Sequence, residues 1–256
     1  MADYDILGTI AIIKSEGKTK EEKTAQAEKI LKEKPSVKTV LEKSSNVKGR
    51  LRTIKTKHLA GKKNLIATCR ENNCTFKFNV ETCYFSPRLS NERQAIAEKI
   101  KSSQKVLVMF AGVGPFPIII YKIAKPKKIT AVELGKDCCK YFKENLKLNK
   151  IPSGKIEIIQ GDAKKKITSK FQKFDIVIMT RPNLKESFLK QGLLASKKGT
   201  IIYYYCFGRD SEIKQQIKQL EREAKKLKRK IKIKEIKKAG EIAPFKHRWR
   251  VEIKVK

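Results

Sequence analysis

A glycine-containing turn has the residue types of a loop that holds a nucleoside. Phe110, Ala111, Gly112 and Gly114 lie in this turn, after an apolar segment and before a helical one. Glycines let a backbone approach a ligand closely, and the start of the following helix favours negative charge. The pattern is GxG and lacks the third glycine of GxGxxG. A small carboxylate joined to an adenosine therefore fits better than a dinucleotide pyrophosphate.

Two acidic residues follow the turn at the ends of later predicted strands. Glu133, beside Leu134, comes about 20 residues after the glycines, where a carboxylate accepts hydrogen bonds from both hydroxyls of a ribose. Asp162, beside Ala163, follows the next predicted strand and is placed to meet an adenine. Each acid alone is more often a helix cap or a turn residue. At consecutive strand ends around one crevice, the two acids together indicate a nucleoside-binding site.

The segment Thr180-Arg181-Pro182 closes a further predicted strand, 174–179. Groups at this strand end face the same crevice, so Thr180 and Pro182 are expected where a transferred group would sit. The alternative is a plain strand-to-helix turn, because proline commonly marks turns.

The elements that must hold these residues alternate between strand and helix after residue 104. Several of the strands are apolar without alternation, which is typical of a parallel sheet covered on both faces. An amphipathic helix is expected at 211–227, and strands 230–236 and 249–256 are expected to form a hairpin at the sheet edge. The other expected strands are 105–110, 129–134, 156–160, 174–179 and 199–207, with helices at 116–124 and 137–149.

The first hundred residues show a mixed pattern of short strands and helices. Thr19 and Glu22 have the spacing of a capping box, which opens a helix that stops before Pro35. Asn72-Asn73 predicts a hairpin turn, and Ser90 is expected to cap a helix at 91–101. Strands are expected at 6–14, 37–41, 51–55, 65–69 and 75–80. We therefore predict a smaller α+β module, 1–101, before a Rossmann-like α/β domain, 102–256.

The charge of the chain points to a polyanionic partner. The formal net charge is +35, from 61 Lys and Arg against 26 Asp and Glu. Such an excess repels itself, and binding to nucleic acid relieves it as counterions leave the phosphates. A surface that is merely coated with lysine is the alternative, and the densest basic run, 225–238, has the same two interpretations.

Composition argues against several other classes of protein. No apolar run reaches the roughly 20 residues that span a bilayer, and the N-terminus lacks the pattern of a secretory signal, so we expect a cytoplasmic protein without a membrane partner. The six cysteines form no CxxC pair and there are only two histidines, so zinc spacing is absent. We expect free thiols, no metal ion and a monomer.

Three longer motifs are specific in combination. They are Cys69-Arg-Glu-Asn-Asn73, Cys83-Tyr-Phe-Ser-Pro-Arg-Leu-Ser-Asn-Glu-Arg93 and Met109-Phe-Ala-Gly-Val-Gly-Pro-Phe116. With Tyr203-Tyr-Tyr205 and Ile242-Ala-Pro244, they resemble the archaeal and eukaryotic tRNA (guanine-N1)-methyltransferase family that acts at tRNA position 37. The chain resembles a short form without the N-terminal module that contacts the outer corner of tRNA. The resemblance implies a Rossmann-like class I methyltransferase domain, S-adenosyl-L-methionine as cofactor and tRNA as partner.

The same resemblance implies roles for individual residues. Glu92 matches the general base that removes the proton from guanine N1, and Arg52 matches the arginine that stabilises negative charge on O6. Arg88 resembles the residue that orients the base, and Arg93 resembles a cofactor contact. A glutamate that merely begins a helix is the alternative for Glu92. Thr180 and Pro182 complete the expected catalytic set; the expected cofactor set is Arg93, Phe110, Ala111, Gly112, Gly114, Glu133, Leu134, Asp162, Ala163 and Thr180.

Departures from the family pattern leave three alternatives open. Val108 replaces a usual aspartate, and Thr180-Arg181-Pro182 replaces a usual Asn-Leu-Pro. The first alternative is transfer of an aminocarboxypropyl group from the same cofactor to a wyosine precursor, although Pro115 and Arg88-Leu89 favour methyl transfer. The second is methylation of a wyosine intermediate at the same tRNA position, in a pocket widened at Thr180. The third is a tRNA-binding protein that has lost catalysis.

Overall fold

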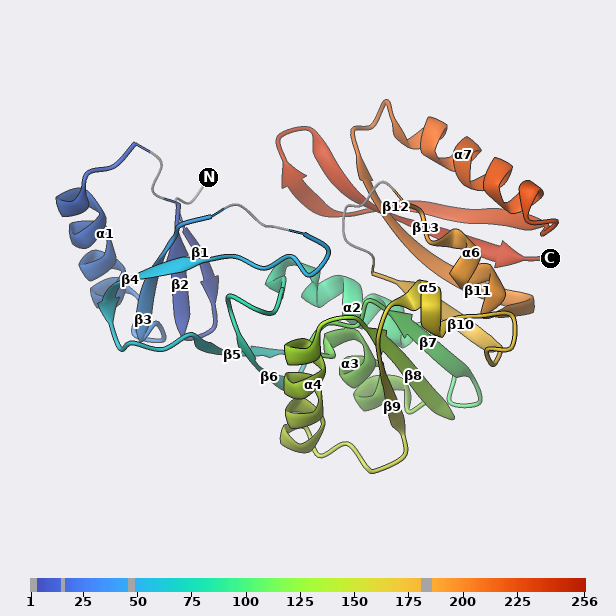
Figure 1. Cartoon of the computed structure of the whole chain (residues 1–256), viewed down its shortest axis with the longest axis horizontal. Coiled ribbons are helices and arrows are strands. Elements are labelled where there is room, and N and C mark those ends of the chain that lie inside the picture. Colours follow the sequence, from blue (N-terminus) through green and yellow to red (C-terminus); the bar gives the residue numbers. More distant parts are fainter. Residues whose placement is uncertain (1–3, 15–16, 46–48, 181–185) are drawn as a thin grey trace.

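The computed structural model describes residues 4–14, 17–45, 49–180 and 186–256. Figure 1 shows an N-terminal sheet with one helix, and a larger sheet whose flanking helices lie on both of its faces. A short hairpin connects these two parts along the chain. Arg181, Pro182 and the other predicted features of 181–185 lie outside the described residues.

The N-terminal sheet has four strands and is covered by one helix. Its order is β1 (Tyr4–Leu7), β2 (Ile10–Ile13), β3 (Thr39–Lys43) and β4 (Thr56–Gly61), and α1 (Lys20–Glu33) joins the parallel pair β2 and β3. The predicted capping box is confirmed: Glu22 N–H donates to Thr19 Oγ1 over 3.3 Å, and Thr19 N–H donates to Glu22 Oε2 over 2.8 Å. Ala27 and Ile30 of α1 are buried against β2 and β3.

Two predictions in this module were wrong. The segment 6–14 is not one strand but a hairpin, because the chain reverses at Gly8, whose φ is +58°. A Cβ at Gly8 would lie 1.8 Å from the carbonyl oxygen of Thr68, so the close approach of the next hairpin requires glycine. The segment 51–55 forms turns instead of a strand, and Arg52 there has a left-handed φ of +58°.

The connecting hairpin consists of β5 (Ile66–Glu71) and β6 (Cys74–Asn79). It reverses at Asn72 and Asn73, as predicted, and both have positive φ. Two buried asparagines hydrogen-bond to the free edge of β6. Asn145 lies in α4 (Lys136–Leu148), and Asn149 is the C-cap of that helix. Lys77 N–H donates to Asn145 Oδ1 and Thr75 N–H to Asn149 Oδ1, each over 2.8 Å. The hairpin is thereby fixed to the larger sheet.

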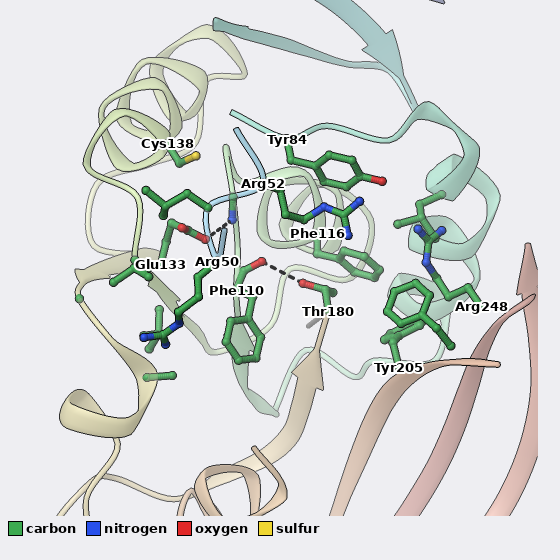
Figure 2. Close-up of a pocket in the computed structure, with 18 residues that line it drawn as sticks. Arg50, Arg52, Tyr84, Phe110, Phe116, Glu133, Cys138, Thr180, Tyr205 and Arg248 are labelled. Atoms are coloured by element: carbon green, nitrogen blue, oxygen red, sulfur yellow. Dashed lines mark hydrogen bonds between the residues drawn. The ribbon is translucent and has the colours of Figure 1, made fainter. Parts of the chain in front are cut away.

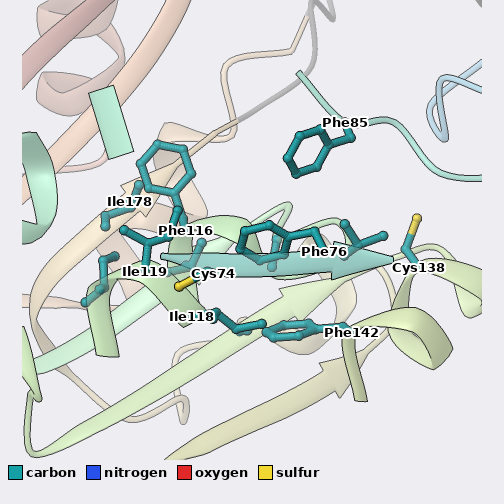
Figure 3. Close-up of a cluster of buried hydrophobic side chains, with 14 of the residues drawn as sticks. Cys74, Phe76, Phe85, Phe116, Ile118, Ile119, Cys138, Phe142 and Ile178 are labelled. Carbon is teal, nitrogen blue, oxygen red and sulfur yellow. The ribbon is translucent and has the colours of Figure 1, made fainter. Parts of the chain in front are cut away.

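One hydrophobic core continues from this hairpin into the larger domain. Phe76 of β6 and Phe85 pack with Phe116 and Ile118 of α3 (Pro115–Ala124) and with Phe142 of α4 (Figure 3). The same core includes Ile96 and Ala97 of α2 (Ser90–Glu98), which follows the 3₁₀ helix η1 (Pro87–Leu89). The division at residues 101 and 102 stays a prediction, and this core includes residues on both sides of it.

The prediction that Ser90 caps α2 was wrong. Leu89 is the N-cap of α2, and Ser90 is its first helical residue. The Ser90 hydroxyl instead accepts a hydrogen bond from Asn72 Nδ2 over 3.2 Å, and the Ser90 carbonyl oxygen accepts from the same nitrogen over 3.1 Å. The start of α2 is thus held by the turn of the β5–β6 hairpin.

The larger sheet has seven strands in the order β12-β13-β11-β10-β7-β8-β9. The strands β7 (Lys105–Met109), β8 (Lys128–Glu133), β9 (Ile156–Gln160), β10 (Phe174–Met179) and β11 (Ser196–Gly208) are parallel, and β12 (Ile231–Ala243) and β13 (Lys246–Val255) form the predicted antiparallel hairpin at one edge. Helices α3 and α4 share one core with the sheet, and α6 (Leu189–Leu194) and α7 (Ile213–Lys226) share another. The predicted Rossmann-like fold is confirmed.

The strand order creates a switch point between β7 and β10. From β7 the chain adds β8 and β9 on one side, and it then returns to add β10 and β11 on the other. The connections therefore diverge at the carboxyl ends of β7 and β10 and leave a crevice there, which is where open α/β sheets bind ligands.

Candidate functional site

A pocket opens at these carboxyl ends and extends toward the N-terminal part of the chain (Figure 2). Strand ends and the turns after β7, β8 and β9 form one end of the pocket, which we call the cofactor end. Side chains from the segment 50–52, from the segment before η1 and from β11 and β13 form the other, which we call the acceptor end. The predicted site residues in its lining are Arg52, Phe110, Gly112, Glu133, Leu134, Ala163 and Thr180.

Glu133 organises the cofactor end. Its Oε2 accepts a hydrogen bond from the Gly112 backbone N–H and its Oε1 from the Gly135 backbone N–H, each over 2.7 Å. Burial raises the pKa of the Glu133 carboxyl, and the backbone donors partly offset this effect. Each carboxylate oxygen can accept more than one hydrogen bond. The geometry therefore suits a carboxylate that is positioned by the glycine turn and accepts from the hydroxyls of a ribose.

The two glycines of the turn have different structural roles. Gly112 has φ +58° and lines the pocket, and the nearest atom to an added Cβ would be 3.8 Å away. Gly114 lies outside the pocket lining. A Cβ there would lie 2.2 Å from the Phe142 ring, so Gly114 lets α3 pack closely on α4. Ala111 is also behind the pocket, with its N–H bonded to the Val132 carbonyl oxygen over 3.2 Å.

Asp162 caps a helix and pairs with an arginine. Its Oδ1 accepts from the Lys164 N–H at the start of α5 (Ala163–Lys166), and its Oδ2 accepts from Arg50 Nη1, each over 2.9 Å. The hydrogen bond from Arg50 lowers the pKa of the Asp162 carboxyl. Gly161 and Ala163 line the pocket on either side of Asp162. The helix-cap alternative is therefore what the structure shows for Asp162 itself.

Thr180 lies at the end of β10, at the centre of the pocket in Figure 2. Its hydroxyl donates to the carbonyl oxygens of Phe110 and Met109, over 2.9 and 3.2 Å. Thr180 thereby ties β10 to the turn after β7, and its oxygen keeps acceptor capacity toward the pocket. Phe110 has a left-handed φ of +61°, an uncommon conformation for a residue other than glycine.

Arginines and aromatic rings form the acceptor end. The Arg52 guanidinium carbon lies 4.0 Å from the centroid of the Tyr84 ring, an arrangement that Figure 2 shows above Thr180. Among the described residues, Arg52 Nε is buried without a hydrogen-bond partner. Arg248 also faces this end, and burial lowers the pKa of its guanidinium. Tyr205 and Phe207 of β11 complete the wall. Together, these arginines and aromatic rings can hold a flat, electron-rich ligand with an acceptor oxygen.

Glu92 lies behind this wall and does not line the pocket. It is 9% exposed, and its Oε1 accepts from the Tyr205 hydroxyl over 2.7 Å and from Arg250 Nη1 over 2.8 Å. Arg250 is 1% exposed and also donates from Nη2 to Glu235 over 2.7 Å. The carboxylate is therefore one side chain away from the pocket, with Tyr205 between them.

Two predicted site arginines are not in the lining of this pocket, although Arg88 lines an adjoining cavity that includes Arg52 and Tyr84 as well. Arg88 donates to Asp5 over 2.8 Å, across the contact between η1 and the N-terminal sheet. Arg93 is 2% exposed and forms a buried ion pair with Glu71 of β5. It donates further to the Ser86 carbonyl oxygen over 2.9 Å. Arg88 and Arg93 therefore hold the segments around the site together in this structure.

Eleven of the lining residues were not among the predicted site residues, and they include Arg50, Tyr84, Phe207 and Arg248. Tyr84 was within a quoted motif, so its neighbours gave a signal. Arg50 and Arg248 have no local signal, because basic residues are frequent throughout this chain. The described residues contain no group of three or more His, Cys, Asp or Glu that could hold a metal ion. In the same residues, no helix has the length and apolarity needed to cross a membrane.

The residues that line the cofactor end fit S-adenosyl-L-methionine. An adenosine needs a ribose acceptor and an apolar slot for the base, and Glu133, Leu134, Phe110 and Ala163 offer these in one cavity. The open backbone at Gly112 leaves room for close approach.

Family profiles match nearly the whole chain. A profile described as the TRM5/TYW2 methyltransferase domain matches residues 67–233, and one described as the TYW2 N-terminal domain matches 1–64. The chain is 34% identical over 209 residues to the tRNA (guanine(37)-N(1))-methyltransferase Trm5b of Pyrococcus abyssi, with 82% of this chain and 61% of that protein covered. It is 32% identical to the tRNA (guanine(37)-N(1))/4-demethylwyosine(37)-methyltransferase Taw22 of Nanoarchaeum equitans, with 98% of each chain covered.

Solved structures agree with this fold. The crystal structure of Trm5b from Pyrococcus abyssi superposes with a TM-score of 0.86 at 30% identity, covering 99% of this chain and 74% of that one. A structure of aTrm5 in complex with tRNALeu superposes with a TM-score of 0.87 at 29% identity, covering 99% and 72%. A Trm5 from Methanocaldococcus jannaschii, in complex with adenosine, superposes with a TM-score of 0.84 at 28% identity.

Proposed function

This chain belongs to the TRM5/TYW2 methyltransferase family, and on that premise we propose that it transfers a methyl group from S-adenosyl-L-methionine to N1 of guanine 37 in tRNA. One observation carries the proposal. The carboxylate and glycine turn suited to an adenosine, and the arginine and tyrosine suited to a purine, line the same pocket on either side of Thr180.

The acceptor end has the groups that this reaction needs. Guanine N1 carries a proton at neutral pH, so a base must take that proton as N1 attacks. The buried, unpartnered Nε of Arg52 can donate to O6, where negative charge builds as the proton leaves. Tyr84 can stack against the purine face, and Glu92 is the nearest buried carboxylate behind the wall.

The cofactor end positions the donor. When bound, S-adenosyl-L-methionine supplies the electrophilic methyl group. Glu133 would hold the ribose, and the turn from Phe110 to Gly112 would limit how deeply the ligand enters. Alignment of N1 with the methyl group would lower the barrier further, in addition to the effects of the base and of Arg52.

Charge supports an RNA partner. The net charge of +35 exceeds what a small polar ligand requires. Exposed lysines of β12 continue this charge over the edge of the large sheet: Lys232, Lys234, Lys237 and Lys238. If they neutralise phosphates, the logarithm of the tRNA affinity falls linearly and steeply with the logarithm of salt concentration. A shallow dependence would count against this role.

Mass spectrometry of nucleosides tests the reaction. Unmodified tRNA is incubated with the protein and S-adenosyl-L-methionine and digested, and N1-methylguanosine is expected. Glu92→Ala should lower the rate about 10²- to 10⁴-fold, as loss of a general base does. Glu98→Ala is the matched control, because Glu98 lies on the same helix but is exposed, and it accepts a hydrogen bond from Gln94 on that helix. Wild-type protein that binds the cofactor but leaves guanine 37 unmethylated would refute the proposal.

A second activity is favoured by one relative. The Nanoarchaeum equitans protein that matches this chain over 98% of both lengths is named for guanine 37 and for 4-demethylwyosine 37. We propose that this chain also methylates 4-demethylwyosine, because the threonine at position 180 leaves more room than the usual asparagine of the family. The same assay on tRNA that carries 4-demethylwyosine tests this. A product heavier by an aminocarboxypropyl group instead of a methyl group would replace the proposal with the sister reaction.

A further inference from the structure

We propose that Tyr205 is a catalytic residue that relays the proton from guanine N1 to Glu92. This proposal rests on the proposed function and deepens it. Tyr205 lines the pocket, whereas Glu92 does not. Figure 2 shows Tyr205 among the side chains that line the pocket, and its hydroxyl is 2.7 Å from Glu92 Oε1, so the tyrosine can link a bound base to the carboxylate.

Tyr205 is held in place for this task. Tyr205 is 2% exposed. The centroid of its ring lies 6.1 Å from the ring centroid of Phe116, which also lines the pocket. Burial, and then the charge of Glu92, raise the pKa of Tyr205 well above its usual range. The hydroxyl therefore keeps its proton at neutral pH and donates it to Glu92, and its oxygen retains a lone pair that can accept another proton.

The carboxylate is fixed as firmly as the tyrosine. Arg250 Nη1 donates to the same Oε1 that accepts from Tyr205, over 2.8 Å. Arg250 is itself held by Glu235 of β12, which also pairs with Lys99 over 3.3 Å. A carboxylate bound in this way cannot swing into the pocket without breaking a buried ion pair, which leaves a buried charge without its partner. Proton transfer through Tyr205 avoids that movement.

The relay balances in protons and electrons. The N1–H bond of guanine breaks as a new O–H bond forms on the tyrosine oxygen, and the original tyrosine O–H bond breaks as the proton passes to Glu92. The electron pair freed on N1 forms the bond to the methyl carbon. The carbon–sulfur bond breaks, and its electron pair stays on the sulfur of S-adenosylhomocysteine. Glu92 then releases its proton to solvent, and the tyrosine is regenerated.

A proton inventory on the wild-type protein tests the relay without any substitution. The single-turnover rate of methyl transfer is measured in mixtures of H₂O and D₂O. Two protons in motion give a rate that curves downward from a straight line as the deuterium fraction rises, and direct transfer to Glu92 gives a straight line. A straight line would overturn the relay. Wild-type protein with no transfer to guanine would instead refute the proposed function.

Substitution of the tyrosine gives a second test. Tyr205→Phe should lower the single-turnover rate about 10²- to 10⁴-fold. The dissociation constant of S-adenosyl-L-methionine should stay within about threefold, which shows that the fold is intact. Tyr203→Phe is the matched control, because Tyr203 is a buried tyrosine on the same face of β11. It should leave the rate within about threefold. A Tyr205→Phe protein that keeps the wild-type rate would refute the relay.

A titration without substrate or cofactor checks the link between the two side chains. The absorbance change of tyrosine ionisation is followed in the wild type and in Glu92→Gln, with Tyr205→Phe to identify the signal of Tyr205. Because the Glu92 charge raises the pKa of Tyr205, that signal should move to lower pH in Glu92→Gln. No movement would show that the carboxylate and the tyrosine are not coupled.

Discussion

The two ends of the pocket are built in different ways. The cofactor end consists mostly of backbone and short side chains at the ends of consecutive parallel strands, and Glu133 bonds to amides only two and 21 residues away. The acceptor end consists of long side chains from segments far apart in sequence: Arg52, Tyr84, Tyr205 and Arg248. A strand–turn–helix unit positions the first end, and packing between distant segments positions the second.

The two ends of the pocket also differ in how firmly their backbone is held. Each end contains one non-glycine residue with a left-handed φ, Phe110 at the cofactor end and Arg52 at the acceptor end. Phe110 follows a buried strand and is tied to Thr180 by a hydrogen bond of 2.9 Å. Arg52 lies on a turn outside any strand and rests on Tyr84. We infer that the acceptor end is the part that adapts to the base.

The largest expected effect is at the acceptor end. Arg52→Ala removes a donor to the developing charge on O6, so kcat for guanine methylation should fall about 10²- to 10³-fold. The dissociation constant of S-adenosyl-L-methionine, measured by calorimetry, should stay within about threefold, because the Arg52 guanidinium packs on Tyr84 at the acceptor end. A parallel loss of cofactor affinity would show that the two ends are not separable. Arg52→Lys keeps the charge but loses the planar fork, so it should rescue only partly.

The next largest effect concerns the packing behind the cofactor end. Gly114→Ala places a Cβ 2.2 Å from the Phe142 ring at a φ of +89°, so the free energy of unfolding should fall by about 2–4 kcal/mol. Gly112→Ala is the control, because its Cβ has no neighbour closer than 3.8 Å and only backbone strain remains. Urea unfolding of both proteins measures the difference. Equal losses would mean that the ring contact with Phe142 does not matter.

Loss of the Glu133 carboxylate should weaken cofactor binding and leave the acceptor end unchanged. Glu133→Ala removes the carboxylate that we propose as the acceptor for the ribose hydroxyls, so the dissociation constant of S-adenosyl-L-methionine should rise about tenfold to a hundredfold. Binding of tRNA alone should change little, because the acceptor end is intact. Calorimetry for the cofactor and filter binding for tRNA give both values. Weakened tRNA binding would indicate that Glu133 also supports the acceptor end.

The pH dependence of cofactor binding follows from the same carboxyl. Burial raises the pKa of Glu133, so protonation as the pH falls begins at a higher pH than for an exposed glutamate. A protonated carboxyl accepts hydrogen bonds poorly, so cofactor affinity should weaken in mild acid, and cofactor binding should release protons there. Calorimetry in buffers of different ionisation enthalpy counts those protons. Glu133→Gln should show no such dependence.

The smallest expected effect is on the ion pair that bridges the two ends. Arg50 comes from the N-terminal segment and pairs with Asp162 over 2.9 Å, but its side chain is 46% exposed. Solvent screens such a pair, so Arg50→Ala should lower the free energy of unfolding by less than about 1 kcal/mol. Its effect should shrink further at high salt. A larger loss would mean that this pair controls the closure of the N-terminal module on the large sheet.

Local patterns were sufficient for the cofactor end and for most of the fold. The capping box at Thr19 and Glu22, the turn at Asn72-Asn73 and the edge hairpin of β12 and β13 were predicted and are confirmed. The family and the Rossmann-like fold were predicted as well. Each of these signals depends on residues that are neighbours in sequence or lie at successive strand ends.

The failures share one cause, which is contact with a distant segment. The strand expected at 6–14 reverses at Gly8 because the Thr68 backbone packs there. Ser90 does not cap α2, since Asn72 engages it instead. The roles of Arg88 and Arg93 stay predictions, and their ion-pair partners in this structure, Asp5 and Glu71, also come from distant segments. None of these partners is visible in the local sequence.

The amino-acid sequence by itself determined the type of sheet, the glycine turn and Glu133, because periodicity and turn chemistry act over a few residues. Only the tertiary structure decided how the acceptor end is assembled. Burial of one shared core brings Arg52, Tyr84, Tyr205 and Arg248 together from four segments, and the same burial leaves Glu92 behind Tyr205. Long side chains meet only where packing has already fixed their backbones, so their contacts are a property of the folded chain.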